Sequence, residues 1–253
     1  MARPFVLAET TWRAIKDVTM EVAVLPWGAT EAHNYHLPYG ADVIESESIA
    51  ILAAEHAWNR GARVIVLPTV PFGVQTGQLD IPFCLNLNPS TQHAVLRDLL
   101  DVLGTHGVRK FVILNGHGGN DFRQIIRELQ PATSLLLTQV NWYQALDARR
   151  WFDEPGDHGG ELETSVMLHV APDLVRPLNE AGPGSARMPL VRAMREGWAW
   201  TPRRWTRVTD DTGVGNPARA TREKGQRYVE ALTVAIGEFL ADLAAVDPER
   251  LYE

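Results

Sequence analysis

The sequence holds one cysteine, no long apolar run and no excess of basic residues, and each of these shortages excludes a class of protein. Cys84 alone cannot form an intramolecular disulfide or a multi-cysteine zinc site. No apolar run approaches the ~18 residues that a membrane span needs, and the N-terminus lacks an apolar leader core, so we expect a cytoplasmic protein without a membrane partner. The 24 basic residues against 31 acidic residues, a net charge of −7, argue against nucleic-acid binding.

The composition is typical of a soluble globular protein. Apolar residues make up 45% and charged residues 22% of the 253 residues, which is enough for a substantial core. No Gly/Ser-rich or charge-block linker divides the chain. We therefore expect one domain over residues 1–253.

Apolar runs with many β-branched residues alternate with segments in which apolar residues recur at helical spacing. This alternation predicts an α/β fold with a mostly parallel sheet that helices cover on both faces. The predicted strands are 21–28, 63–70, 110–116 and 133–143, and the predicted helices are 44–58, 91–107, 121–130, 161–170 and 220–246.

Two loops at the carboxyl ends of predicted strands carry reactive side chains. The stretch TEAHNYHLPYGAD (30–42) follows the first strand. Its two carboxylates and two imidazoles belong to Glu31, His33, His36 and Asp42. NGHGGND (115–121) follows the third strand and places His117 among glycines, which let the backbone approach a compact site. Because ligands of open α/β sheets bind at this edge, we expect both loops to form one site.

A divalent metal ion explains these side chains best. Glu31 and His33 are two residues apart, so in an extended segment they point to the same side. Asp42 follows the turn HLPYG, which can fold the chain back toward them. Together with His117 they form a set of ligands that suits zinc, iron or manganese.

Each residue also has a structural explanation. A histidine near a strand end, such as His33, is more often a hydrogen-bonded structural residue than a ligand. Asp42 could cap a helix that starts at Val43. The 115–121 loop could cradle a phosphate, although it lacks the Lys and Ser/Thr of a P-loop. Taken jointly, the residues favour the metal site.

A third segment, DHGGELETSVMLH (157–169), contributes further candidates. The turn of His158 and two glycines can hold an imidazole over a pocket, so we expect His158 to face the site. Glu161 and Glu163 open the helix that follows. Acidic residues in a first helical turn are favoured by the helix dipole alone. Whether Glu161 reaches the metal therefore stays open at this point.

Three segments together resemble the creatininase family, the creatinine amidohydrolases: EAHNYHLPYGAD, NGHGGN and HGGELETS. A fourth, GVGNPARATREKG (213–225), is similar to the family's segment near the C-terminus. The resemblance implies a three-layer α/β/α sandwich and a centre of two divalent metal ions, Zn, Mn or Fe. It also implies an amidohydrolase that cleaves a non-peptide C–N bond in a small cyclic amide or formamide, and a homo-oligomer, with a hexamer suspected.

Matching the family's motifs residue by residue implies a ligand set. Glu31, Asp42 and His117 would hold one ion, while His33 and Asp42 would hold the other, with Asp42 as the bridge. The family's glutamate two residues after the motif histidine is replaced here by Gly119. Glu161 is the proposed substitute, as a ligand or as a catalytic acid or base.

The catalytic and substrate-binding candidates follow from the expected mechanism, metal-assisted hydrolysis, and from residue type. His158 is the expected proton donor, and His36 is expected to support the metal ligands by hydrogen bonding. The family's Gly-Pro between the two histidines is replaced by Asn34 and Tyr35, which reshapes the expected pocket. The expected pocket residues are Tyr35, His36, Gly118, Gly119, Trp142 and Trp151.

Three alternatives remain. The Trp- and Arg-rich segment 195–207 could be a lid over a planar or anionic substrate or, with a slight preference, an arm at a subunit interface. The same metals could serve an isomerase or lyase, although the motif loops hold no lysine base. A non-catalytic small-molecule-binding member would be expected to have lost at least one ligand.

Overall fold

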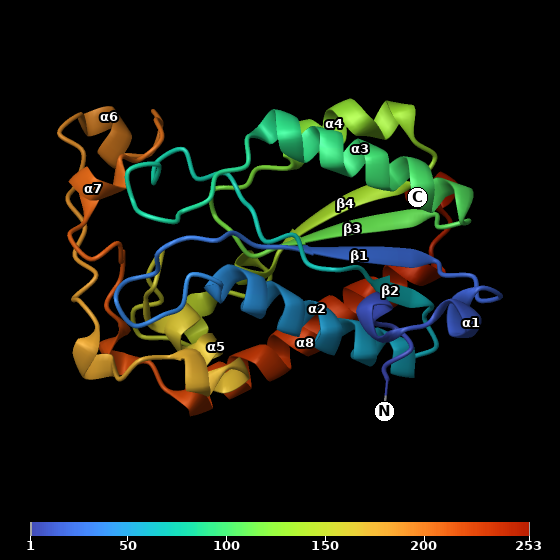
Figure 1. Cartoon of the computed structure of the whole chain (residues 1–253), viewed down its shortest axis with the longest axis horizontal. Coiled ribbons are helices and arrows are strands. Elements are labelled where there is room, and N and C mark those ends of the chain that lie inside the picture. The colour runs from blue at the N-terminus through green and yellow to red at the C-terminus, as the bar shows by residue number, and fades with distance from the viewer. Residues whose placement is uncertain (1, 253) are drawn as a thin grey trace.

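The computed structural model describes residues 2–252, and its centre is a sheet of parallel strands (Figure 1). The strand order is β2-β1-β3-β4, and every neighbouring pair runs parallel. The strands are β1 (Val22–Trp27), β2 (Val64–Val66), β3 (Lys110–Asn115) and β4 (Leu136–Asn141). Trp27 pairs with Asn115, and Asn115 with Asn141, so the carboxyl ends of three strands meet at one edge.

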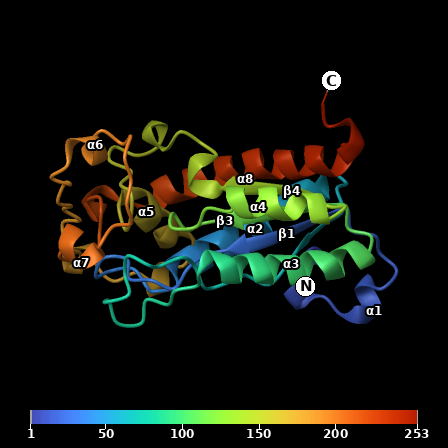
Figure 2. The ribbon, with the colours of Figure 1, turned by 90° about the horizontal axis from the view of Figure 1, so that it is seen from above.

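Helices cover both faces of the sheet, as Figure 2 shows from above. The residues of β1 and β3 alternate between two apolar layers: Val24 and Val112 face one layer, while Leu25 and Ile113 face the other. On the first face lie α2 (Ala41–Asn59), α5 (Glu161–Val170) and α8 (Arg222–Ala245). On the second face lie α3 (Pro89–Thr105) and α4 (Arg123–Leu129). The predicted three-layer α/β/α fold with a parallel central sheet is confirmed.

The element boundaries follow local sequence signals. The helix α5 begins after Gly160 and ends before Pro172. The helix α8 begins at a capping residue, Thr221, whose side chain accepts a hydrogen bond from the Lys224 amide at 3.2 Å. The strand β2 is shorter than the predicted 63–70, since Pro68 has no N–H to donate to a strand ladder.

Short elements that the sequence did not predict decorate the sheet and its helices. Three are single helical turns, α1 (Trp12–Ile15), α6 (Arg192–Arg195) and α7 (Trp205–Val208). The 3-10 turns are Leu7–Glu9, Gln130–Ala132, Trp142–Gln144, Ala148–Arg150, Pro172–Leu174, Leu178–Glu180, Pro217–Arg219 and Pro248–Arg250. Within residues 2–252, no helix combines the length and the apolar character that crossing a membrane requires.

Candidate metal centre

Buried carboxylates and imidazoles from four segments meet beyond the carboxyl ends of the strands. They are Glu31 and His33 after β1, Asp42 in the first turn of α2, His117 after β3, His158 before α5 and Glu163 in α5. We call these six residues the histidine–carboxylate cluster. All are buried except Glu163, which is half-buried. The two loops that the sequence placed at one edge of the sheet therefore do meet.

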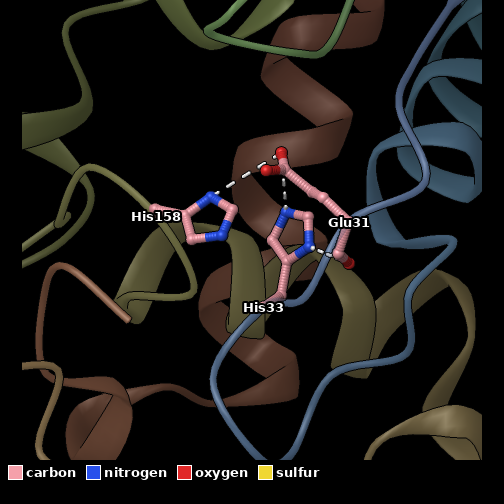
Figure 3. Close-up of side chains that lie close together, drawn as sticks. All are labelled: Glu31, His33 and His158. Atoms are coloured by element: carbon pink, nitrogen blue, oxygen red, sulfur yellow. Dashed lines mark hydrogen bonds and ion pairs between the residues drawn. The ribbon is translucent and has the colours of Figure 1, made fainter. Parts of the chain in front are cut away.

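The two carboxylate oxygens of Asp42 face two different imidazoles. Asp42 Oδ1 lies 2.9 Å from His33 Nε2, and Asp42 Oδ2 lies 3.0 Å from His117 Nδ1. Glu31 Oε1 lies 2.7 Å from the same His117 nitrogen. Glu31 Oε1 is also 3.9 Å from His33 Nε2 and 3.9 Å from His158 Nδ1 (Figure 3).

Each imidazole of the cluster is fixed by a backbone carbonyl on its other nitrogen. His33 Nδ1 lies 3.2 Å from the Glu31 carbonyl oxygen, and His117 Nε2 lies 3.0 Å from that of Val74. His158 Nε2 lies 2.8 Å from the Ala32 carbonyl oxygen. Since a carbonyl only accepts, these ring nitrogens donate, and in the neutral ring the opposite nitrogens have the lone pair that a metal ion would use. This is the arrangement that orients histidine ligands of metal ions.

Two buried polar atoms of the cluster lack a hydrogen bond within the described part of the chain. They are His33 Nε2 and Asp42 Oδ2, although each lies close to an atom of opposite character. Buried polar atoms without partners are rare, because leaving one unpaired costs about 1–3 kcal/mol. Nitrogen and carboxylate oxygen atoms that converge without bonding one another fit a shared divalent cation.

Close charges shift the proton equilibria of the cluster. Burial disfavours the charged form of His33, but the Asp42 carboxylate outweighs it and raises the pKa of His33 to about 10. Burial acts in the same way on His117, and there Glu31 and Asp42 hold the pKa well above its usual value. Burial also opposes ionisation of Glu31, yet the three imidazoles hold its pKa well below the usual value. Without metal, protons on His33 and His117 therefore balance the carboxylates.

The structure does not bring Glu161 into the cluster. Its carboxylate accepts hydrogen bonds from the Glu154 amide, at 2.8 Å, and from Lys224 Nζ. Glu163 instead completes a group with His33 and Asp42 that could hold a metal ion. Residues two apart on a helix point in directions about 200° apart, so Glu161 faces α8 while Glu163 faces the cluster.

His158 is held between the cluster and a tryptophan. Its ring stacks on His33 with 4.0 Å between centroids, and Trp205 packs on it at 4.7 Å. Its backbone exchanges hydrogen bonds with Val214 at 3.0 and 2.7 Å. The motif 213–225 therefore contributes through this pairing, which fixes the turn that carries His158.

A cavity of about 250 Å³ opens above the cluster. Of the six pocket residues that the sequence predicted, Gly118 and Gly119 line it. A side chain at position 119 would not fit, since its Cβ would lie 2.3 Å from His117 Nε2 and 2.4 Å from the Val74 carbonyl oxygen. Lining residues that the sequence reasoning missed are Val74, Gln75, Thr76 and Gly77. Trp200, Pro202, Arg203 and Trp205 also line the cavity, which favours the alternative that the segment 195–207 covers the site.

The other four predicted pocket residues do not line this cavity. The exposed Tyr35 donates through its hydroxyl to the Asp210 carbonyl at 3.0 Å. His36 is fully buried, with Nε2 2.8 Å from Thr164 Oγ1. Trp142 and Trp151 pack in the apolar layer beneath α8. Aromatic side chains suit a core as well as a pocket, so their type alone did not separate the two.

Asn34 also serves the loop and not the cavity. Its φ is 53°, in the left-handed region that asparagine tolerates better than most residues. Its side-chain amide donates to the Gly182 carbonyl at 3.0 Å, and its backbone amide donates to Thr212 Oγ1 at 2.9 Å. These bonds tie the turn after His33 to the 182 and 212 loops.

Gln78 is a further residue that the sequence did not reveal. It is fully buried, and its side-chain amide donates to Glu31 Oε2. Its carbonyl oxygen accepts from Cys84 Sγ at 3.1 Å, and Cys84 Sγ accepts from the Ala32 amide at 3.3 Å. The single cysteine thus helps to orient the cluster's Glu31.

Glu45, one turn after Asp42 on α2, is a fully buried carboxyl whose oxygens lack hydrogen-bond partners in residues 2–252. Burial, and then the carboxylates of Glu163 and Asp42, raise its pKa well above 4.5. Unfolding frees this carboxyl to ionise above pH 4.5, so the wild type loses stability there as pH rises. Glu45→Gln cannot ionise. In metal-free protein its stability relative to wild type should rise with pH, by at most about 1.4 kcal/mol per pH unit.

Urea unfolding between pH 5 and pH 8 measures this difference. A difference that stays constant over that range would show that Glu45 is ionised in the folded protein.

The chain is similar to several known proteins. The Creatininase family (creatinine amidohydrolase) matches residues 8–240. A creatinine amidohydrolase of Pseudomonas putida is 25% identical, covering 96% of this chain and 98% of that protein. A mycofactocin precursor peptide peptidase of Mycolicibacterium smegmatis is 28% identical, covering 90% and 87%. A solved structure from Bacteroides fragilis, a proposed creatinine amidohydrolase, has a TM-score of 0.93 with 41% identity and covers both chains completely.

Two further solved structures share the fold, and their descriptions name the metal that those proteins contain. One is described as a manganese creatininase and the other as a Zn–Zn form of a creatininase variant. They share the fold at a TM-score of 0.78 each, with 23% and 24% identity, and cover 96% of this chain and 99% of their own.

Proposed function

Because the chain belongs to the creatininase family of hydrolases, we propose that it hydrolyses a C–N bond in a small cyclic amide or a formamide. The observation that carries this proposal is the histidine–carboxylate cluster. Its imidazole nitrogens face carboxylates on one side and are fixed by backbone carbonyls on the other. An arrangement of this kind, buried at the floor of a small cavity, suits metal-assisted hydrolysis.

We assign two divalent ions to the cluster. Glu31, Asp42 and His117 would hold one ion, while His33, Asp42 and Glu163 would hold the other. Asp42 would bridge the two, since its two oxygens face the two groups separately. Zinc, manganese and iron all accept such ligands, and when bound they lower the pKa of a water and polarise a carbonyl group.

His158 is the proposed proton donor to the leaving nitrogen. Its Nε2–H is bonded to the Ala32 carbonyl, which leaves Nδ1 to carry the exchanged proton. Its ring lines the cavity, and His33 and Trp205 hold it on two sides. The chain's own contribution is therefore to orient one proton carrier beside the cluster and to limit the surrounding water.

Metal content per chain tests this assignment. By elemental analysis, wild-type protein purified without chelator should hold about two divalent ions, and Glu163→Gln about one. Glu161→Gln is the matched control two residues away. It should keep both ions and lose about 1.5–3 kcal/mol of unfolding free energy, since it weakens the buried hydrogen bonds to Lys224 and Glu154.

Ion loss in Glu161→Gln but not in Glu163→Gln would reverse the ligand assignment. If wild-type protein held no ion and took none up on reconstitution, the hydrolase proposal itself would fail.

A peptide bond is the second candidate for the scissile C–N bond. The similarity to mycofactocin precursor peptide peptidases favours it. The cavity of about 250 Å³ favours the small amide. A panel of cyclic amides, formamides and short peptides, assayed with reconstituted protein, separates the two by which class is turned over.

A further inference from the structure

One strongly basic side chain lies at the mouth of the cavity above the histidine–carboxylate cluster. Among the described residues that line this cavity, Arg203 is the one lysine or arginine. Its side chain is 47% exposed, so it borders both the cavity and the solvent. The buried Glu31, Asp42 and His117 line the same cavity and form its floor.

The backbone around Arg203 is fastened to the loop that forms the facing wall. The Trp205 amide donates to the Gly77 carbonyl at 3.0 Å, and Thr206 Oγ1 lies 2.7 Å from Asp80 Oδ2. A Cβ at position 77 would lie 2.1 Å from the Arg203 carbonyl oxygen, so this contact requires glycine. The position of Arg203 is therefore built into the fold.

The guanidinium group of Arg203 is only partly engaged. Nη1 donates to Asp157, and Cζ lies 5.6 Å from the Trp205 ring centroid. Nε and Nη2 donate no hydrogen bond within residues 2–252. Two adjacent N–H groups on one side of a guanidinium match the two oxygens of a carboxylate.

We propose that the substrate carries a carboxylate, which Arg203 binds at the mouth of the cavity while the scissile C–N bond lies over the cluster. This inference rests on the proposed function. A carboxylate fits better than a phosphate, because a single partly neutralised guanidinium offers one two-pronged contact and phosphate sites usually gather several donors. The cavity thus recognises its substrate at two points, the metal ions and Arg203.

Probes that bind at both points test the proposal directly. The monohydroxamates of succinic, glutaric and adipic acid carry a metal-chelating group and a carboxylate at increasing separation. The matching primary amides replace only the carboxylate. In titration calorimetry on metal-loaded protein, the acid of the best length should bind at least 10-fold more tightly than its amide.

Substitutions at two arginines of the segment 195–207 test whether Arg203 causes the preference for the acid. Arg203→Met should reduce the preference for the acid to less than 2-fold. Arg207→Met, an exposed arginine that does not line the cavity, should keep it. Hydroxamates that bind with no preference for the acid at any length, or a preference that survives Arg203→Met, would overturn the proposal. Failure of every hydroxamate to bind to the metal-loaded protein would instead show that the bound ions cannot be reached from the cavity, which would refute the proposed function.

Discussion

Asp42→Asn is expected to remove metal binding and hydrolysis together. The substitution keeps the size of the side chain but removes the charge and one of the two oxygens that lie 2.9 Å from His33 and 3.0 Å from His117. Loss of an outer partner of a metal ligand typically costs 10–100-fold, so loss of a shared ligand should lower kcat/KM by more than about 100-fold. Bound metal should fall from about two ions per chain to less than one.

Glu45→Gln is the matched control for Asp42→Asn. Both residues are fully buried carboxyls on α2 and lie one helical turn apart, but Glu45 does not line the cavity or belong to the cluster. Glu45→Gln should keep both ions and activity within a few-fold of wild type. If Asp42→Asn retained two ions, measured by elemental analysis, the bridging role of Asp42 would be refuted.

His158→Gln is expected to lower kcat while the protein keeps its metal ions. Glutamine retains a polar group but cannot carry a proton to the leaving nitrogen, and general acid catalysis typically contributes about 10²–10⁴-fold. KM should change much less than kcat, because glutamine keeps a polar side chain at this position and the other cavity residues, Arg203 included, are unchanged. In the wild type, activity should fall at the pH where the proton donor loses its proton. This fall should be absent from the pH–rate profile of the variant.

His36→Gln separates this effect from the general loss of a buried histidine. His36 is fully buried and lies against Thr164, away from the cavity. The His36→Gln variant should keep the wild-type pH–rate profile. Metal loss in His158→Gln would assign His158 to the ligands, since it also forms a possible metal group with Glu31 and His33.

The layout of the fold could be predicted because the strands and the helices differ in the spacing of their apolar residues. The strands β1 and β3 are buried on both faces, so they appear as continuous apolar runs, and α5 lies between Gly160 and Pro172. The prediction of 63–70 for β2 followed the apolar run alone and passed over Pro68, which has no N–H to donate to a strand ladder, so β2 covers only Val64–Val66.

The core of the site was likewise visible in the sequence, because parallel strands deliver their following loops to one edge. The sequence did not show which of Glu161 and Glu163 faces the histidine–carboxylate cluster. Both lie in the first turn of α5, and what selects between them is the rotation of that helix against α8, where Lys224 pairs with Glu161. The same holds for Trp205, whose segment lies far along the chain from the His158 that it covers.

Because backbone carbonyls fix the imidazoles, the side chains of the same residues can change without loss of these hydrogen bonds. Val74 holds His117 through its carbonyl, and the same residue lines the cavity. Every residue type supplies that carbonyl, so substitutions at position 74 can alter which molecules fit without disturbing the ring beneath.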